Sequence, residues 1–509
     1  MSLRRFFEII PGFMSWATIT AFVLSSKFFP FYVAIFMILF DTYWLFKTIY
    51  FYFHLHSTGR DLQRNMKTDW LAKLKNDPET SGRWEEVYHL IILPMYKEPF
   101  EVVKESFENL LRADYPKDKM LVVLAQEERA GEEANEVGRK IEEAYGGRFY
   151  KFLVTAHPAD LPNEIPGKGS NEAWAGKEAQ RLLIDELKID YEKVMVSVFD
   201  VDTQVAKGYF GILTYAFLTT PYPQRSSYQP IPFFNNNIFD SPALARVMAY
   251  STTFWGMMEQ SRPEHLVTFS SHSTPFKALA EMGFWDTDFV SEDSHIFWQL
   301  FTHYNGDWRV VPLKYPVSMD VNVAPKFWQT VRNLYKQQRR WAWGVENFPY
   351  VVTRFLKNKK IPLKDKIYRA YSEFSGGYSW TTSALIISLG WLPVFLGGKE
   401  FDKTLLSYSL PHIASYLMWV GSFGMIMSGI LTLSILPPKP QWFKAHHYVF
   451  YTAQWLLTPI NMVLLGTLPA FESQTRLMLG GKFRLGFWVT PKSRKTEGAS
   501  PAPAVSGAK

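Results

Sequence analysis

The apolar residues of this chain are concentrated near its two ends, and this uneven distribution limits the folds open to it. An apolar run from about 13 to 29 is followed at once by a second from 29 to 53. Further runs occur at about 380–396, 408–436 and 449–468. These lengths are close to what a helix needs to cross the hydrocarbon core of a bilayer. The middle of the chain is charged and mixed, so the sequence predicts a soluble domain carried between membrane segments.

A cleavable signal peptide is the alternative interpretation of the first apolar run. No small-residue cleavage site follows that run and a second begins immediately, so we expect a membrane hairpin. The net charge of +7 is modest and includes short tracts beside apolar runs, at Arg4-Arg5 and at 482–495. This pattern indicates positive-inside topology rather than nucleic-acid binding. The chain has no cysteine, which excludes disulfides, thiolate metal sites and cysteine nucleophiles.

Strand-like and helix-like segments alternate in the first part of the central region. Short apolar segments at 87–93, 120–125 and 149–155 read as buried strands, and 101–112 and 132–144 read as helices. Alternation at this spacing predicts a mostly parallel α/β sheet.

A fourth strand is predicted at Val194 to Phe199, and it ends in Asp200-Val201-Asp202. An extended backbone puts Asp200 and Asp202 on the same side. Two carboxylates at the carboxyl end of a strand suit Mg²⁺ or Mn²⁺ bound to a diphosphate. An ordinary acidic turn is the alternative for an isolated motif of this kind.

Three further clusters follow in the sequence, and each is weak when taken alone. Glu292-Asp293 could be a helix start, where acidic residues are favoured by the helix dipole. Gln337 to Trp341 could be a basic face near lipid headgroups. The third cluster is Phe487 to Lys492, behind the last apolar run. Gly167-Lys168 does not complete a P-loop, because Pro162 and Gly169 stand where glycine and Ser or Thr are required.

The order of these clusters resembles the membrane-embedded family-two glycosyltransferases, the group that contains cellulose and hyaluronan synthases. The resemblance covers about residues 87–345, the trailing FxVTxK motif and the apolar runs. It implies a GT-A-like, mostly parallel α/β glycosyltransferase domain inserted between transmembrane helices. It also implies a nucleotide-sugar donor, a glycan or lipid acceptor, contact with membrane lipid, Mg²⁺ or Mn²⁺ as cofactor, and a cytoplasmic catalytic domain.

The resemblance assigns roles to individual residues. Asp293 would be the general base, with Glu292 beside it, and Asp200 and Asp202 would hold the metal. Donor or nucleotide contacts would come from Pro94, Tyr96, Glu98, Glu127, Asp200, Arg340, Thr490 and Lys492. Acceptor contacts would come from Gln337 and Trp341. Two further candidates do not follow from the resemblance: Lys168 for contact with phosphate and Trp285 for contact with the acceptor. An exposed loop lysine is the alternative at Lys168, and a headgroup-level anchor is the alternative at Trp341.

This chain departs from the family pattern at three places. Ser291 replaces the threonine of the T-E-D motif. Gln126-Glu127-Glu128 replaces the usual acidic pair after the second strand, and Ser270 to Ser273 replaces a loop that often contains glycine. The motifs nevertheless predict an inverting, metal-dependent transferase that uses a UDP-sugar to extend a β-linked polysaccharide.

Two other functions stay open. An enzyme of the same fold could add one sugar to a lipid such as diacylglycerol or polyprenyl phosphate. A transporter or scaffold without catalysis is the third hypothesis, and it would give a role to Asp41 inside the second apolar run.

The predicted organisation has seven parts. These are a transmembrane hairpin (1–56), a membrane-surface connector (57–86), the glycosyltransferase domain (87–349), interfacial amphipathic helices (350–378), C-terminal transmembrane helices (379–470), a basic segment resembling a gating loop (471–495) and a disordered tail (496–509). Three C-terminal crossings would leave the basic tail outside the cell, against the positive-inside rule. The segment at Pro459-Asn461 is therefore expected to be broken or re-entrant, or one apolar run does not cross.

Overall fold

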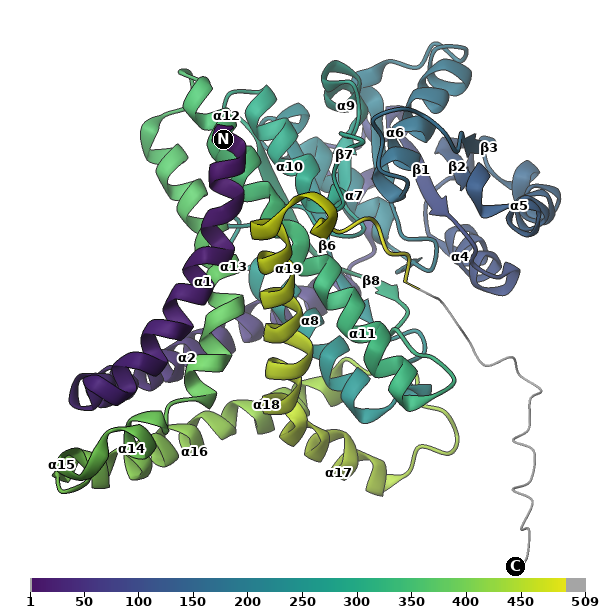
Figure 1. Ribbon diagram of the computed structural model, residues 1–509. Helices are drawn as coiled ribbons and strands as arrows, with labels where there is room; N and C mark the ends of the chain where they lie inside the picture. Colours follow the sequence, from purple (N-terminus) through teal and green to yellow (C-terminus); the bar gives the residue numbers. More distant parts are fainter. Residues whose placement is uncertain (1, 491–509) are drawn as a thin grey trace, which may run out of the picture.

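The computed structural model describes residues 2–490, so Lys492 and the predicted tail lie outside the described residues. Two long apolar helices lead into a domain built on a β-sheet, and a second helical region follows it (Figure 1). The prediction of an α/β domain inserted between apolar helices is confirmed.

An eight-stranded mixed sheet forms the centre of this domain. The four strands predicted from the sequence are neighbours and all run parallel, while the other four strands join through antiparallel and parallel pairs. The order across the sheet is β3 (Lys151–His157), β2 (Met120–Glu127), β1 (Tyr88–Met95), β4 (Val194–Val198), β7 (Ser273–Pro275), β6 (Ser226–Phe234), β8 (Arg309–Met319) and β5 (Gln204–Val205).

Both faces of the parallel half are covered, which explains its continuous apolar strands. In β1, Ile91 and Leu93 pack in one core cluster, and Leu90 and Ile92 pack in another. The first cluster includes side chains from α4 (Phe100–Arg112), α5 (Glu132–Tyr145) and α7 (Tyr209–Thr219). The second includes side chains from α6 (Lys168–Ala179), α9 (Phe276–Met282) and α10 (Glu292–His303).

The strand register brings the carboxyl ends of three strands to one edge. Ile92 of β1 pairs with Val198 of β4, and Met95 pairs with Gln126 of β2. The residues that follow these strands therefore lie side by side, at the edge where open α/β sheets bind ligands.

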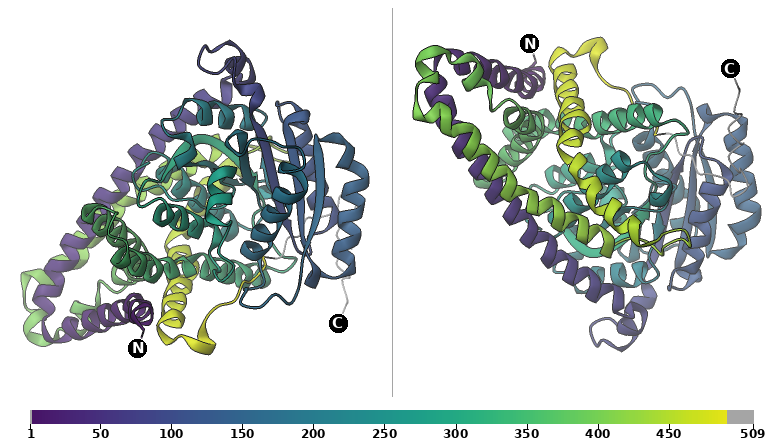
Figure 2. Two further views of the ribbon diagram at one scale, coloured as in Figure 1. Left: turned by 90° about the horizontal axis from the view of Figure 1, so that it is seen from above. Right: turned by 90° about the horizontal axis from the view of Figure 1, so that it is seen from below.

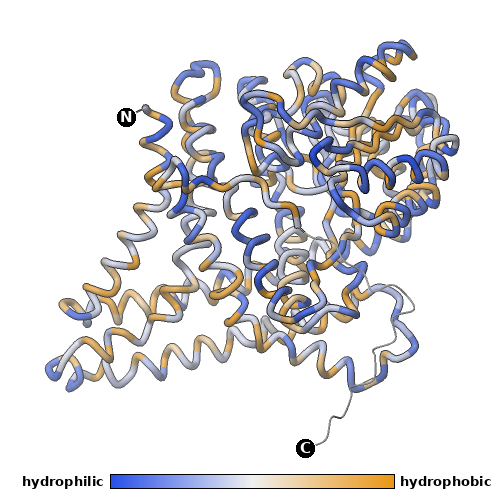
Figure 3. The backbone as a smooth tube through the Cα atoms, turned by 45° about the vertical axis from the view of Figure 1, so that its right-hand side comes forward, coloured by the Kyte–Doolittle hydropathy of each residue, from blue (hydrophilic) through white to orange (hydrophobic). Residues whose placement is uncertain are grey.

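Four helices in the described residues are long and apolar enough to cross a membrane. They are α1 (Leu3–Phe28), α2 (Pro30–Lys67), α16 (Leu405–Ser434) and the bent segment Ala445–Leu479. Figure 3 shows much apolar colouring along the long helices that extend from the sheet domain. Many of their large side chains are exposed, Leu39, Phe46 and Tyr416 among them, as expected for a lipid-facing surface. The chain is thus a candidate membrane protein.

The segment Ala445–Leu479 is not one regular helix. It consists of α17 (Ala445–Ala453), a 3₁₀ turn, α18 (Thr458–Asn461), a π-helical stretch and α19 (Leu468–Leu479). Pro459 and Pro469 lack the N–H that a regular helix needs, which accounts for the changes of helix type around them. The sequence placed the irregularity at Pro459-Asn461, and the structure extends it to residue 467.

A further helix, α13 (Leu363–Ser388), runs through the boundary predicted at 378/379. It is followed by α14 (Leu392–Leu396) and α15 (Gly398–Asp402), which lie near the turn between α1 and α2 (Figure 1). Phe22, Met37 and Phe401 belong to one buried cluster at this end. From there α16 returns along α2 (Figure 2).

Candidate functional site

The Asp200-Val201-Asp202 turn directly follows β4. The amide of Phe199 still donates to the carbonyl of Ile92 at 3.0 Å, so the turn begins where sheet pairing ends. Ser270 donates to Oδ2 of Asp200 at 2.9 Å. Asp202 is fully buried, and its Oδ2 accepts the amide of Asp320 at 3.0 Å. The turn is thus held by contacts from two other segments.

Glu292 and Asp293 occupy the first turn of α10, where backbone N–H groups favour negative charge. Glu292 is buried, whereas the side chain of Asp293 is 23% exposed. Burial and the neighbouring Asp293 carboxylate raise the pKa of Glu292 to about 7. His272 is buried beside this pair, with Nδ1 3.9 Å from Oδ1 of Asp293. Burial lowers the pKa of His272 to about 4, so its imidazole is neutral near pH 7.

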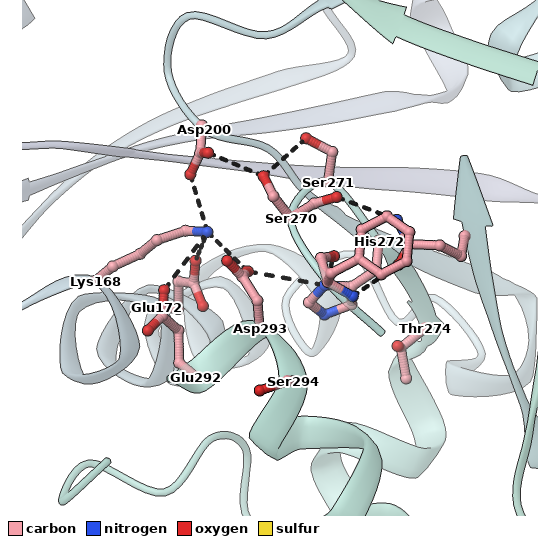
Figure 4. Close-up of polar contacts among 12 residues, drawn as sticks. Lys168, Glu172, Asp200, Ser270, Ser271, His272, Thr274, Glu292, Asp293 and Ser294 are labelled. Atoms are coloured by element: carbon pink, nitrogen blue, oxygen red, sulfur yellow. Dashed lines mark hydrogen bonds and ion pairs between the residues drawn. The ribbon is translucent and has the colours of Figure 1, made fainter. Parts of the chain in front are cut away.

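Lys168 lies at the centre of these acidic residues (Figure 4). Its Nζ is 2.8 Å from Asp293, 2.9 Å from Asp200, 3.5 Å from Glu172 and 3.7 Å from Glu292. Lys168 is 8% exposed, which excludes the exposed loop lysine considered from the sequence. Burial alone would lower the pKa of Lys168, but the carboxylates of Asp200 and Asp293 raise it well above its usual range. The ammonium is therefore charged and links the end of β4 to the start of α10.

The predicted nucleotide contacts at the carboxyl ends of β1 and β2 line the same cavity as Asp200 and Asp293. They are Pro94, Tyr96, Glu98 and Glu127. Two contacts order this region. Glu98 accepts the amide of Tyr96 at 2.7 Å, and Arg129 donates to Glu127 at 2.5 Å while its guanidinium lies 4.6 Å from the ring centre of Tyr96. Arg129 was not singled out from the sequence.

Helix α11 (Phe327–Ala342) brings Gln337, Arg340 and Trp341 to the cavity. The Arg340 guanidinium lies 4.8 Å from the ring centre of Phe487. Phe487 also packs against Gly167, where an added Cβ would come within 2.5 Å of the ring. Thr490 lines the cavity too, so the 487–490 segment lies between the start of α6 and α11.

Among the predicted site residues that the structure describes, Trp285 is the one that does not line the cavity. Its side chain is 3% exposed and belongs to the core cluster behind the sheet, with its ring centre 6.5 Å from that of Phe284. The position before the acidic pair suggested an acceptor contact, but the chain between Trp285 and Glu292 turns the indole inward.

Glu346 and Glu172 are buried carboxyls near the site that sequence analysis missed. Glu346 accepts from the amides of Val290 and Ser291 at 3.0 and 3.1 Å, from Ser291 Oγ at 2.8 Å and from Trp343 Nε1 at 2.8 Å. It therefore fixes the segment that enters α10. The spacing of Lys168 and Glu172, one turn apart on α6, was a usable signal; nothing in the sequence pointed to Glu346.

One cavity of about 1990 Å³ joins the predicted catalytic residues to the apolar helices. Its lining continues from Asp200 and Asp293 to side chains of α2, α13 and α16. These include aromatic residues of α2 and hydroxyl residues of the other two helices, namely Tyr43, Trp44, Ser379, Ser383, Ser422 and Ser428.

Carboxylate oxygens are the ligands that Mg²⁺ and Mn²⁺ prefer, and Asp200 and Asp202 supply them at the strand end. Within residues 2–490, no three His, Asp or Glu side chains are grouped so as to hold a metal ion by themselves. Two carboxylates fit an ion that takes its other ligands from a diphosphate and water.

The sequence matches the family described as glycosyl transferase family group 2 over residues 195–467, which is more than half of the chain. The chain therefore belongs to this glycosyltransferase family, as the order of its motifs predicted. A particular likeness to cellulose or hyaluronan synthases stays a prediction.

Two solved glycosyltransferase structures are similar to the chain at low identity. The mannosyltransferase PcManGT from Pyrobaculum calidifontis, in complex with GDP-Man and Mn²⁺, is 15% identical; the match covers 77% of this chain and 98% of that one, with a TM-score of 0.43. Residues 1–349 of TarS from S. aureus, in complex with UDP-GlcNAc, are 13% identical; the match covers 68% and 92%, with a TM-score of 0.34. No curated protein matches the chain.

Proposed function

We propose that this protein is a membrane-bound, inverting and metal-dependent glycosyltransferase that extends a β-linked polysaccharide from a UDP-sugar. The observation that carries the proposal is the single cavity shared by the Asp200, Asp293 and Arg340 side chains and by three long helices. An acceptor held between those helices can present its end to the donor without leaving the membrane.

The proposed reaction assigns one role to each group. The acceptor hydroxyl oxygen attacks the anomeric carbon from the face opposite the nucleoside diphosphate, and the bond between that carbon and the diphosphate breaks. Asp293 takes the hydroxyl proton. Arg340 suits the leaving diphosphate because its planar fork can donate to two oxygens. Lys168, which lies between Asp200 and Asp293, adds positive charge at the same place.

Asp200 and Asp202 are the residues that would hold Mg²⁺ or Mn²⁺ together with the diphosphate. When bound, such an ion neutralises charge that gathers on the leaving group.

Incubating membranes with a panel of nucleotide sugars, with and without Mn²⁺, and measuring released UDP or GDP tests this function. We expect UDP release from one UDP-sugar and its loss in Asp202→Ala. Absence of release and transfer with every donor, together with indifference to Asp202→Ala, would instead favour a transporter or scaffold.

Addition of one sugar to a lipid is the second candidate function. Apolar side chains such as Phe36, Phe40 and Met418 also line the cavity, and these suit an acyl or prenyl chain. Product length in a radiolabelled assay separates the two functions: a ladder of increasing length supports polymer synthesis, and one lipid-extractable product supports single addition.

We also propose a topology that removes the conflict with the positive-inside rule. α1 and α2 would form one membrane hairpin, and α13 and α16 a second, with α14 and α15 at the far side. The bent segment Ala445–Leu479, although long and apolar enough to cross, would re-enter the membrane from the cytoplasmic side without crossing it. The sheet domain and the basic tail then share the cytoplasmic side. Because the chain has no cysteine, a single introduced cysteine shows on which side of the membrane its position lies. An impermeant maleimide should label Lys399→Cys but not Lys177→Cys in intact cells; the reverse result would contradict the topology.

A further inference from the structure

Two arginines and a histidine lie together at one edge of the cavity, away from the predicted donor contacts. Arg262 and His265 follow the end of α8 (Ala243–Gln260), and Arg369 lies in the first part of α13. All three side chains line the cavity. The Tyr368 hydroxyl lies 2.9 Å from Nε2 of His265 and so joins the two segments. Burial lowers the pKa of His265, and the charges of both arginines lower it further. The Arg369 guanidinium lies 5.9 Å from the ring centre of Tyr368.

Acidic neighbours offset part of the positive charge of this cluster. Among residues 2–490, Arg369 makes no hydrogen bond and no ion pair; its guanidinium instead lies 5.4 and 5.6 Å from the ring centres of Phe297 and Phe301. Nε of Arg262 is buried and has no hydrogen-bond partner among the described residues. The carboxylate of Glu259 lies 3.7 Å from its Nη1. Both arginines are partly buried, and a partly buried guanidinium is stabilised by hydrogen-bond acceptors, so the two groups suit an anionic ligand.

The surroundings of the cluster identify the kind of ligand. Leu363, Ile367 and Tyr371 on α13 are 70%, 62% and 67% exposed, and Trp255 on α8 is 45% exposed. Large exposed apolar and aromatic side chains next to basic ones are typical of the headgroup level of a bilayer. Basic pockets between helices at this level bind anionic lipid headgroups.

We propose that Arg262 and Arg369 bind the phosphate of an anionic membrane lipid that enters the cavity between α8 and α13. Each guanidinium can donate two parallel hydrogen bonds to phosphate oxygens. The Tyr368 hydroxyl can donate a further one. Glu264, whose side chain is 61% exposed, lies 3.8 Å from His265 and lowers the net positive charge of the cluster. A ligand whose negative charge is concentrated on one phosphate therefore suits the two guanidinium groups best.

This phosphate site is built from different elements than the predicted donor site. Lys168 and Arg340, the cations assigned to the diphosphate, belong to α6 and α11, whereas the cluster belongs to α8 and α13. Lipid binding does not rest on the proposed transfer reaction and can be measured without a nucleotide sugar.

The experiment titrates the purified full-length protein in nonionic detergent with dioleoyl phosphatidic acid and follows the thermal unfolding midpoint. Dioleoyl phosphatidylcholine and inorganic phosphate are the two comparison ligands. We expect phosphatidic acid to raise the midpoint most, because ligand that binds only the folded state stabilises it. Arg262→Gln and Arg369→Gln should each weaken binding roughly tenfold, the value of one charge-assisted hydrogen bond.

Two further variants serve as controls. Arg369→Lys retains the charge and should keep most of the affinity, which covers the case in which Arg369→Gln does not fold. Arg354→Gln is the matched control, since that guanidinium also lies over an aromatic ring, 5.2 Å from the centre of Tyr350, but outside the cavity. Equal shifts with phosphatidylcholine, or wild-type affinity in the double glutamine variant, would overturn the proposal. An equally large shift with inorganic phosphate would overturn the assignment to a lipid.

Discussion

Nζ of Lys168 lies 2.8 Å from Oδ1 of Asp293 and 2.9 Å from Oδ1 of Asp200, so one ammonium pairs with carboxylates that are 93 positions apart in the chain. Lys168 itself starts α6, whose position is set by packing behind the sheet. The three segments can meet at this edge because β4 and α10 also direct their acidic residues toward it. The ammonium therefore serves as the protein's own counter-ion for the candidate site.

Replacing Lys168 by glutamine should destabilise the protein in the absence of divalent ions. The change removes one partner of a buried ion pair and leaves Asp200 and Asp293 facing each other. Removal of this kind costs roughly 3–5 kcal/mol. Mn²⁺ should raise the unfolding midpoint more in Lys168→Gln than in the wild type, since an ion held by Asp200 and Asp202 restores positive charge beside the acidic residues. The measurement is differential scanning fluorimetry with and without Mn²⁺. Lys177→Gln, on the exposed face of the same helix, is the control; equal Mn²⁺ shifts in both variants would contradict the counter-ion role.

Asp293→Asn should abolish transfer while leaving nucleotide binding intact. The amide keeps the size of the side chain but cannot take a proton, and general-base catalysis contributes roughly 100- to 10,000-fold. Transfer rate and the dissociation constant of the nucleoside diphosphate are the two measurements. Asp288→Asn, an exposed neighbour, should retain activity. If Asp293→Asn turned over at near the wild-type rate, Asp293 would not be the base.

The parts of the fold that could be predicted from sequence depend on local patterns. The four parallel strands were expected from short apolar segments, and Asp200 from its place after one of them. Glu292-Asp293 at the start of α10 also follows a local rule, because acidic residues suit a helix N-terminus.

The parts that could not be predicted depend on contacts between distant segments. The role of Glu346 depends on the amides that it accepts, which lie 55 and 56 positions earlier in the chain. No local sequence pattern indicates that role. The burial of Trp285 could not be predicted for the complementary reason, since sequence does not tell which side of a loop faces the core. The strands β6, β7 and β8 carry prolines that obscure a strand pattern, Pro230 and Pro232 among them.

Stability should fall as the pH rises from about 4.5 to about 7, and Glu292 should be one cause. Burial raises the pKa of Glu292 from 4.5 to about 7, so the folded protein holds a proton that the unfolded chain releases in this interval. This stabilisation is complete below the pKa that Glu292 has in the unfolded chain. It is lost as the pH passes the pKa of Glu292 in the folded protein, with a slope of up to about 1.4 kcal/mol per pH unit.

Glu292→Gln tests this cause, because glutamine does not titrate. The variant should show a weaker dependence of the unfolding midpoint on pH, measured without divalent ions. Glu143→Gln, which is exposed, should keep the wild-type slope, and an unchanged slope in Glu292→Gln would exclude this residue as a cause.

Glu346 should act as a positioning residue for Asp293. Its carboxylate accepts the two amides and the hydroxyl that fix the turn before α10, and it also accepts Trp343 Nε1 just beyond the Gln337-Arg340-Trp341 motif. Loss of this acceptor frees the start of α10, and a displacement of about 1 Å at a reacting group can cost roughly 100-fold in rate. Glu346→Ala should therefore lower kcat roughly 100-fold while the KM for the nucleotide sugar changes little, because the donor contacts at the ends of β1 and β2 are untouched.

Two variants control this prediction. Glu346→Gln keeps one acceptor oxygen, so its kcat should lie between those of the alanine variant and the wild type. Glu186→Gln, on the exposed surface, should have the wild-type kcat. A folded Glu346→Ala with wild-type kcat, or one in which KM alone rises, would show that Glu346 does not position the base.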